Sequence, residues 1–284
     1  MKSSILIVAI FSALTVPLAQ TSSSPTPVQT PQAGAAATPS QQPQAKNNKE
    51  YAAYKLAASE NDPAQSELAA DKFAQNFPDS ELKGLLYSRV MQMYQMQNNS
   101  SKVVATGRKA IALNPTDPVS LVAVASALVI DIRENDLDRD SRYAEAAKDA
   151  QAALDNMDTG LQVSPSVRAE EIAAAKANWR SVSYDVLGVV AMNKKDYAGA
   201  EQNFQKAADL MKEQPDAAVY LRLSVSQDKQ GKYQQGLDSA NKAAQYAPEG
   251  STEKNLAKQE QARLQKLIAE KNPSAILSPT TPPH

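Results

Sequence analysis

Three aspartates at alternate positions, Asp136, Asp138 and Asp140, have a spacing that suggests metal chemistry. Carboxylates at the first, third and fifth positions begin a calcium-binding loop. Here the sixth position is Ser141, where such a loop needs glycine, and the twelfth is Ala147, where it needs a bidentate glutamate. We therefore interpret the acidic segment as a solvated loop between helices. We expect no metal site, with calcium binding as the minor alternative.

Hydrolytic chemistry lacks its usual side chains. The sequence has a single histidine, His284 in the last position, and no cysteine. A Ser-His-Asp triad, a histidine metal site or a thiolate nucleophile therefore cannot be assembled within a fold. Charged helical surfaces present carboxylate pairs by chance, so acid–base catalysis is only a weak alternative. We expect a protein that is not an enzyme and uses no cofactor.

The charges are balanced, with 30 Lys and Arg residues against 31 Asp and Glu residues and a net charge of −1. Such a chain has no field that would concentrate nucleic acid or an anionic membrane surface. The lack of cysteine also excludes disulfides and the lipidated cysteine of an exported lipoprotein. We expect no nucleic-acid partner and a fold that is held by packing.

The first residues resemble a secretory signal. Lys2 supplies a positive start, an apolar run spans residues 5–14, and Ala19 is a small residue where a peptidase cuts. We predict a signal peptide over 1–19 and an exported protein, periplasmic or secreted, with no stable membrane insertion after cleavage. The alternative is an uncleaved leader that tethers the protein to the membrane.

Both ends of the remaining chain have low complexity. Residues 20–48 are rich in Pro, Ser, Thr and Gln, and residues 272–284 contain the Pro-rich sequence SPTTPPH. Segments with so little apolar matter do not repay the entropy of ordering. We predict a disordered linker, a disordered tail, and a folded domain over 49–271 between them.

The middle of the chain has a helical composition. Ala, Gln, Lys, Glu and Leu dominate it, whereas the whole chain contains only 9 glycines and 5% aromatic residues. Apolar residues recur at helical spacing, with breaks near prolines at residues 61–63, 77–80, 114–118, 213–216 and 247–250. Breaks at these intervals predict stacked helix pairs.

Two successive stretches, 181–216 and 217–250, share one pattern. Each has a tyrosine, then a leucine and a small residue, a second tyrosine, alanines and a closing proline. The residues that carry it in the second stretch are Tyr220, Leu223, Ser224, Gly231, Tyr233, Gly236, Ala240, Ala243 and Pro248. In the first they are Tyr184, Leu187, Gly188, Ala191, Tyr197, Ala200, Phe204, Ala207 and Pro215. This pattern resembles that of the tetratricopeptide repeat family.

Weaker copies precede these two. One contains Tyr87, Tyr94 and Ala110; another runs from Leu121 to a late second helix with Tyr143, Ala146, Ala150 and Ala153; the first spans residues 51–78. With about five repeats, the resemblance implies an all-α, right-handed superhelical solenoid of antiparallel helix pairs. Leu256, Ala257, Leu264, Leu267 and Ile268 form one apolar stripe, which predicts a C-terminal capping helix.

In the resembled family the first helix of each pair, here called the A helix, lines a concave groove that binds protein segments. The second is called the B helix. The resemblance implies a groove lined by Val122, Ser126, Val129, Asp185, Val189, Met192, Leu221, Val225 and Asp228, preceded by Ser88, Gln92 and Gln95. Because this set is largely apolar, we expect it to bind a helix or an apolar peptide. The places of the family's carboxylate-gripping residues hold Asp185, Val189, Leu221 and Val225, which argues against a carboxylate clamp.

The expected function is thus a non-catalytic protein-interaction scaffold in the cell envelope, with a protein or peptide partner. The alternative is a self-assembling structural protein whose groove is filled by its own C-terminal helix or by another subunit, which makes it a homo-oligomer. Met93 and Met96 are further interface candidates, since methionine adapts to irregular apolar surfaces. We expect Trp179 to pack in the core, with an exposed anchor as the alternative.

Overall fold

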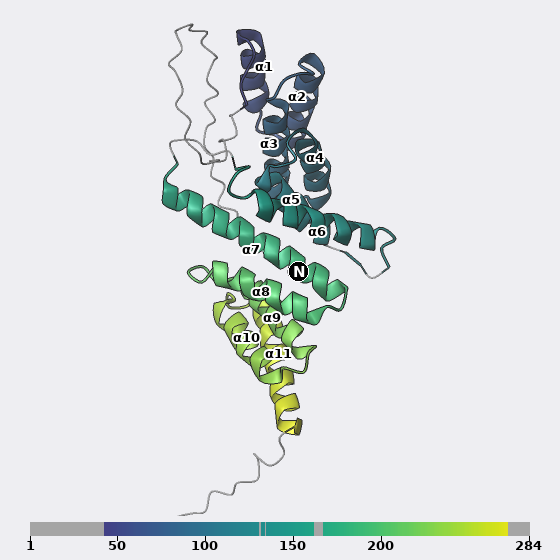
Figure 1. Ribbon diagram of the computed structural model, residues 1–284, viewed down its shortest axis with the longest axis vertical. Helices are drawn as coiled ribbons and strands as arrows, with labels where there is room; N and C mark the ends of the chain where they lie inside the picture. The colour runs from purple at the N-terminus through teal and green to yellow at the C-terminus, as the bar shows by residue number, and fades with distance from the viewer. Residues whose placement is uncertain (1–42, 131, 134, 162–166, 272–284) are drawn as a thin grey trace, which may run out of the picture. The chain divides into compact units, whose positions relative to one another are not determined.

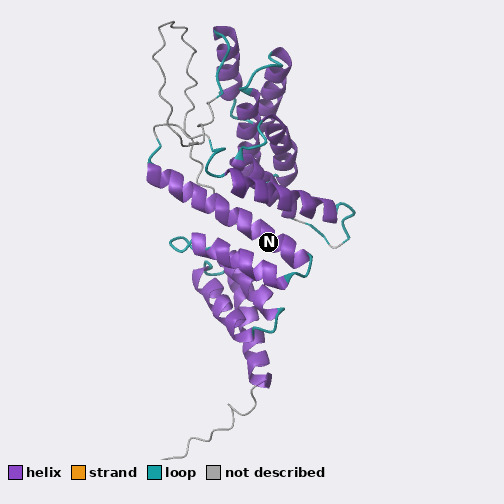
Figure 2. Cartoon of the chain, in the orientation of Figure 1, coloured by secondary structure: helices purple, strands orange, loops and turns teal. Residues whose placement is uncertain are grey.

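A computed structural model describes residues 43–130, 132–133, 135–161 and 167–271 (Figure 1). All regular structure in these ranges is helical, as Figure 2 shows. The helices are α1 (Asn48–Ala58), α2 (Pro63–Asn76), α3 (Lys83–Met96), α4 (Ser100–Leu113), α5 (Pro118–Val129), α6 (Arg139–Asn156), α7 (Ala169–Asn193), α8 (Tyr197–Leu210), α9 (Ala217–Asp228), α10 (Tyr233–Tyr246) and α11 (Thr252–Lys271). In the described part of the chain, no helix is both long and apolar enough to cross a membrane.

The helices begin where the sequence supplies a cap. Asp62, Asp117 and Asp216 each accept a hydrogen bond from the first turn of the helix that follows, at α2, α5 and α9. Pro63 and Pro118 occupy the first helical position, where the missing N–H costs nothing. The predicted breaks near residues 61–63, 114–118 and 213–216 are therefore helix starts.

The described chain divides into two compact units. The N-unit runs to Lys176 and contains α1 to α6 with the first turns of α7; the C-unit begins at Ala177 and contains the rest of α7 with α8 to α11. Within each unit, consecutive helices pack on one another as antiparallel pairs: α1 with α2, α3 with α4 and α5 with α6 in the N-unit, and α9 with α10 in the C-unit. The predicted all-α class built from helix pairs is confirmed.

Small residues set the close approach of helices in the N-unit. Ala146, Ala150 and Ala153, which the sequence places on the late second helix of a degenerate repeat, are fully buried on α6. A Cβ at Gly107 of α4 would lie 2.3 Å from the Val124 side chain of α5. Because Gly107 has no side chain, the backbones of α4 and α5 pack closely at this point.

The predicted capping helix is α11, and it packs on α10 and α9. Ala257 and Leu264 are fully buried, while Leu256, Leu267 and Ile268 are half-buried. The remaining positions of α11 are mostly polar and exposed, as expected for a helix that closes the end of a stack.

The predicted leader (1–19), the tail (272–284) and residues 20–42 of the linker lie outside the described residues. The last linker residues contact the first helix. Ala45 is 3% exposed, and the Asn47 side chain accepts a hydrogen bond from the Glu50 N–H at 2.9 Å, which caps α1.

Candidate protein-binding surface

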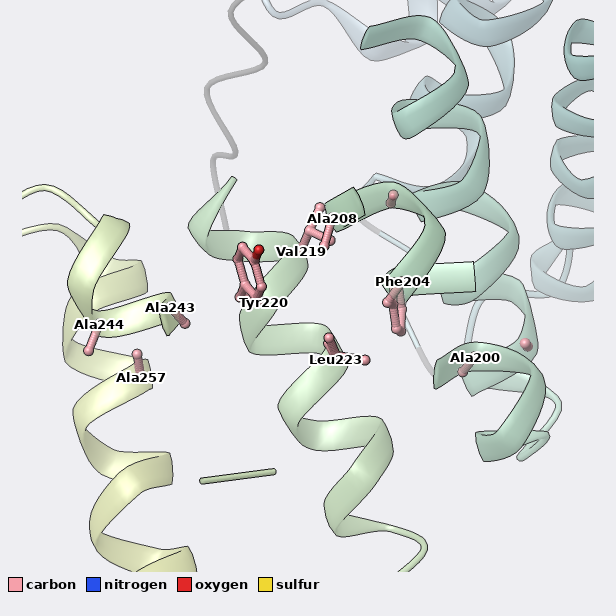
Figure 3. Packing of buried hydrophobic residues seen from close by; sticks show 11 residues of the cluster. Ala200, Phe204, Ala208, Val219, Tyr220, Leu223, Ala243, Ala244 and Ala257 are labelled. Atoms are coloured by element: carbon pink, nitrogen blue, oxygen red, sulfur yellow. The ribbon is translucent and has the colours of Figure 1, made fainter. Parts of the chain in front are cut away.

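The C-unit has one apolar core, to which α7, α8, α9, α10 and α11 contribute (Figure 3). Phe204 of α8 is a fully buried member of this core. The glycine that faces it, Gly188 of α7, leaves no room for a side chain, because a Cβ there would lie 2.4 Å from the ring. Gly188 therefore sets the distance between α7 and α8.

The apolar groove residues predicted in this unit lie at the edge of that core. Val189 and Met192 on α7 and Leu221 on α9 pack against the core cluster but are only partly buried. Val225, one turn after Leu221, is also half-buried. The two A helices thus present four apolar side chains that still have solvent-accessible surface.

Asp185 of α7 does not offer a free carboxylate to a partner. Arg222 of α9 holds it with two hydrogen bonds, Nε to Oδ1 at 2.9 Å and Nη2 to Oδ2 at 2.7 Å. The side chains are 19% and 30% exposed, so water screens the pair only in part. This ion pair links the A helices of two successive repeats and satisfies the charge that the sequence places in the groove.

Asp228 is likewise satisfied, by the capping helix. Arg263 of α11 donates to the Asp228 carboxylate at 2.7 Å and also pairs with Glu260 at 2.9 Å. Asp228 is only 10% exposed at its side chain. The capping helix therefore covers Asp228, the last of the predicted groove residues.

The groove positions of the N-unit differ from those of the C-unit. Val122 and Ser126 are buried, with 5% and 7% exposed, and Val129 is half-buried. The reason is α5 itself, which is buried around nearly its whole circumference and has the highest apolar content of the helices. Ser88 bonds to the start of the same helix, with its hydroxyl 3.0 Å from that of Ser120.

The two methionines predicted as interface candidates differ in their exposure. Met93 is buried with 5% exposed, whereas Met96, at the end of α3, is 62% exposed. Met93 therefore belongs to the core, and only Met96 is available to a partner. Trp179 is half-buried on α7.

Two of the three aspartates with calcium-loop spacing, Asp136 and Asp140, interact with nearby arginines. Asp136 accepts from the Arg133 N–H at 2.8 Å and lies 3.8 Å from an Arg142 nitrogen, while Asp140 pairs with Arg139 at 3.3 Å. No cluster of three metal-ligating side chains occurs among the described residues. Arginines therefore engage the carboxylates of Asp136 and Asp140.

A recurring Tyr–Lys contact was not predicted from the sequence. Lys109, Lys206 and Lys242 lie over the rings of Tyr87, Tyr184 and Tyr220, at 5.0, 5.1 and 5.5 Å from the centroids. In each case the lysine on the B helix follows the tyrosine on the A helix by 22 residues. That constant interval, once aligned on the repeats, is the signal that could have revealed the contact.

Asp149 on α6 is a buried carboxyl with 7% exposed. Burial, together with the neighbouring charge of Glu145, raises the pKa of Asp149 to about 6. Lys148 and Arg108 oppose the shift without cancelling it. The raised pKa of Asp149 could not be predicted from the sequence, because only the packing of α6 removes this carboxyl from water.

No protein-family model matches the chain, and no curated protein matches it in sequence. Solved structures with a similar arrangement of helices include the assembly chaperone of RpL4 (Acl4), at 9% identity and a TM-score of 0.42, over 80% of this chain and 98% of that one. Another is the APC/C hetero-tetramer Cut9-Hcn1, at 18% identity and a TM-score of 0.36, over 80% of this chain and 44% of that one. Both TM-scores lie below 0.5.

Proposed function

We propose that the chain is a non-catalytic scaffold that binds an apolar helix or peptide of another protein on the A-helix face of its C-unit. The observation that carries the proposal is the set of four half-exposed apolar side chains on α7 and α9. Three of them, Val189, Met192 and Leu221, pack against the core cluster, so the surface is formed before a partner arrives. A preformed apolar surface loses little conformational entropy on binding.

The charges near this face select the partner's chemistry. Asp185 and Asp228 are both neutralised within the chain, by Arg222 and Arg263. A charged partner segment would meet no unpaired counter-charge among these groups, whereas an apolar one would bury surface against Val189 and Leu221. The proposal therefore favours an apolar face of an amphipathic helix over an acidic or basic peptide.

An envelope location is part of the same proposal and depends on the sequence of residues 1–19. A charged start, an apolar run and a small residue at position 19 favour export. Fusion of residues 1–25 to a reporter that is active only after export tests it. Activity supports the location, and a reporter retained inside the cell contradicts it.

The binding face is tested by affinity capture of the full chain from envelope extracts, with partners quantified by mass spectrometry. The paired substitution Val189→Asp and Leu221→Asp is expected to remove the specific partner, because it places two unpaired charges on the apolar face. A matched control, Gln205→Asp with Gln245→Asp, adds the same charge on exposed positions of α8 and α10 and is expected to retain the partner. Equal recovery with both pairs would rule out this face.

A self-assembling protein is the second candidate, and the contact between Arg263 and Asp228 favours it, since α11 already reaches the A-helix face. In that case the occupant is internal or a second copy of the chain. Light scattering over a hundredfold concentration range tests for a second copy, since a mass that grows with concentration supports self-assembly. A constant monomer mass excludes a second copy as the occupant.

A further inference from the structure

Glu67 of α2 joins its helix to both helices of the next pair. Its carboxylate accepts a hydrogen bond from the Tyr94 hydroxyl of α3 at 2.8 Å and from the Lys102 ammonium of α4 at 2.8 Å. The same ammonium lies 5.4 Å from the centroid of the Tyr94 ring. Each of the three groups contacts the other two, so α2, α3 and α4 meet in one polar triangle.

Asp71, one turn further along α2, repeats the arrangement. It accepts from the Tyr87 hydroxyl at 2.7 Å and from the Lys109 ammonium at 2.8 Å, and this ammonium lies 5.0 Å from the centroid of the Tyr87 ring. Lys109 is also 3.8 Å from Glu67. The two triangles are therefore coupled through one lysine.

Both carboxylates are partly shielded from water, with side chains 16% and 37% exposed. Burial alone would raise the pKa of Glu67, but the hydrogen bonds from Lys102 and Tyr94 outweigh it and hold that pKa below its usual range. For Asp71, burial is likewise outweighed by the hydrogen bonds from Lys109 and Tyr87, which lower its pKa. The charged forms are thus the ones that the folded junction stabilises.

The charged and titratable groups that act on these carboxylates come from α3 and α4, namely Tyr87, Tyr94, Lys102 and Lys109. On the other side of α2, the contact with α1 is aromatic, with the rings of Tyr54 and Phe73 6.3 Å apart. Arg89 of α3 adds two contacts from its Nη2, to the Glu60 carbonyl at 2.8 Å and to the Asn61 Oδ1 at 3.4 Å. Glu67 and Asp71 therefore accept four hydrogen bonds that hold the first helix pair on the second, besides the ion pair of Lys109 with Glu67.

We propose that the Glu67 and Asp71 triangles form an acid-released latch, which holds the pair α1–α2 on α3–α4 at neutral pH and lets it detach on acidification. A group whose pKa is depressed in the folded state contributes stability above its unfolded pKa and loses it as the pH falls through the folded value. Protonation of both carboxylates removes both contributions together. The core of α5 and α6 does not use the latch and stays closed.

The chain contains no cysteine, so a single introduced thiol reports opening at a chosen place. Ala70→Cys lies on α2 at 1% exposed, and Ala125→Cys on α5 at 0%, which makes a matched pair in the N-unit. The full chain of each is reacted with 4,4′-dithiodipyridine, which labels thiols in acid, at pH 7 and at pH 3. The labelling rate at position 70 is divided by that at position 125 at each pH. This ratio removes the intrinsic pH dependence of the reaction, which is the same for both thiols.

The latch predicts that the ratio of position 70 to position 125 rises several-fold between pH 7 and pH 3, because both folded carboxyls keep their charge until the pH falls below their usual pKa range. With Glu67→Gln and Asp71→Asn together, the ratio is expected to be high at pH 7 and to change little with pH. If that double variant does not fold, Glu67→Gln alone replaces it and is expected to give part of the same rise at pH 7. A ratio that stays constant with pH, or a folded double variant that behaves as the parent, overturns the latch.

Discussion

The ammonium of Lys206 lies 5.1 Å above the ring of Tyr184, and the pair joins α8 to α7 within one repeat. The same contact at the same interval recurs in two other repeats. A cation over an aromatic face at an exposed site contributes about 0.5 to 1 kcal/mol. The contact is therefore a modest but repeated stabiliser of the helix pair.

Replacement of Lys206 by Met keeps the apolar stem and removes the charge. We expect the free energy of unfolding to fall by about 0.5 kcal/mol, because only the cation–π attraction is lost. Urea denaturation measures the change. Lys194→Met, at an exposed lysine just beyond α7, serves as the control and is expected to have no effect. An equal effect of both changes would mean that the ring contact contributes nothing.

Gly188→Ala tests the close approach of α7 and α8. An added Cβ would meet the Phe204 ring at 2.4 Å, so we expect a loss of about 1 to 3 kcal/mol despite the better helix propensity of alanine. Gly84→Ala on α3 is the matched control, since its Cβ would meet only Leu113 at an ordinary 3.6 Å. Phe204→Leu in the Gly188→Ala background is expected to recover part of the loss, and a loss that is the same in both backgrounds would show that the ring is not its cause.

Asp185→Asn removes one partner of the ion pair between the A helices. Arg222 is then left partly buried without its carboxylate, and we expect a loss of about 1 to 2 kcal/mol, with water screening part of the effect. A double-mutant cycle with Arg222→Met, followed by urea denaturation, isolates the coupling. Strict additivity would show that the two residues do not stabilise each other.

Asp149 makes stability depend on pH in the opposite direction from the latch. Its pKa in the folded protein is about 6, above the usual 3.8, so the folded state binds the proton more tightly than the unfolded state. The contribution of Asp149 to the free energy of unfolding is therefore largest at low pH. It falls by about 2 to 3 kcal/mol as the pH rises from about 4 to 6. Asp149→Asn is expected to be more stable than the parent at pH 7 and to lose that advantage near pH 4.

Thermal denaturation from pH 4 to pH 7 measures the difference between the parent and the Asp149 variant, so that the other carboxylates cancel. Asp155→Asn, an exposed aspartate on the same helix, is the control. A difference that does not vary with pH would mean that Asp149 is ionised throughout this range.

The helices and their pairing could be predicted because their signals are local. Aspartate or asparagine before a helix, proline in its first turn and apolar residues at helical spacing are all readable within a few residues, as at Asp62 and Pro63. Even the degenerate repeat with Tyr143 and Ala150 was placed correctly, because its alanines keep the helical interval. The capping helix followed from one apolar stripe.

The binding surface was harder to predict, because the exposure and charge of its residues depend on contacts with residues far along the chain. Asp185 and Asp228 look like free groove charges in the sequence, yet Arg222 and Arg263 neutralise them from other helices. Val122 stands at a position that lines the groove in the resembled family, but it is buried here because nearly all of α5 is apolar and packed. Such outcomes follow from packing between elements, which a repeat pattern does not encode.

Photo-crosslinking from the A-helix face tests the proposed scaffold most directly. A benzophenone amino acid at Val225, on the proposed face, and at Gln245, on an exposed part of α10, is irradiated in intact cells. The scaffold predicts a discrete adduct with a different protein from position 225 only, lost when Val189→Asp and Leu221→Asp are added. No adduct from position 225, adducts with another copy of the chain alone, or the same adducts from both positions would contradict it.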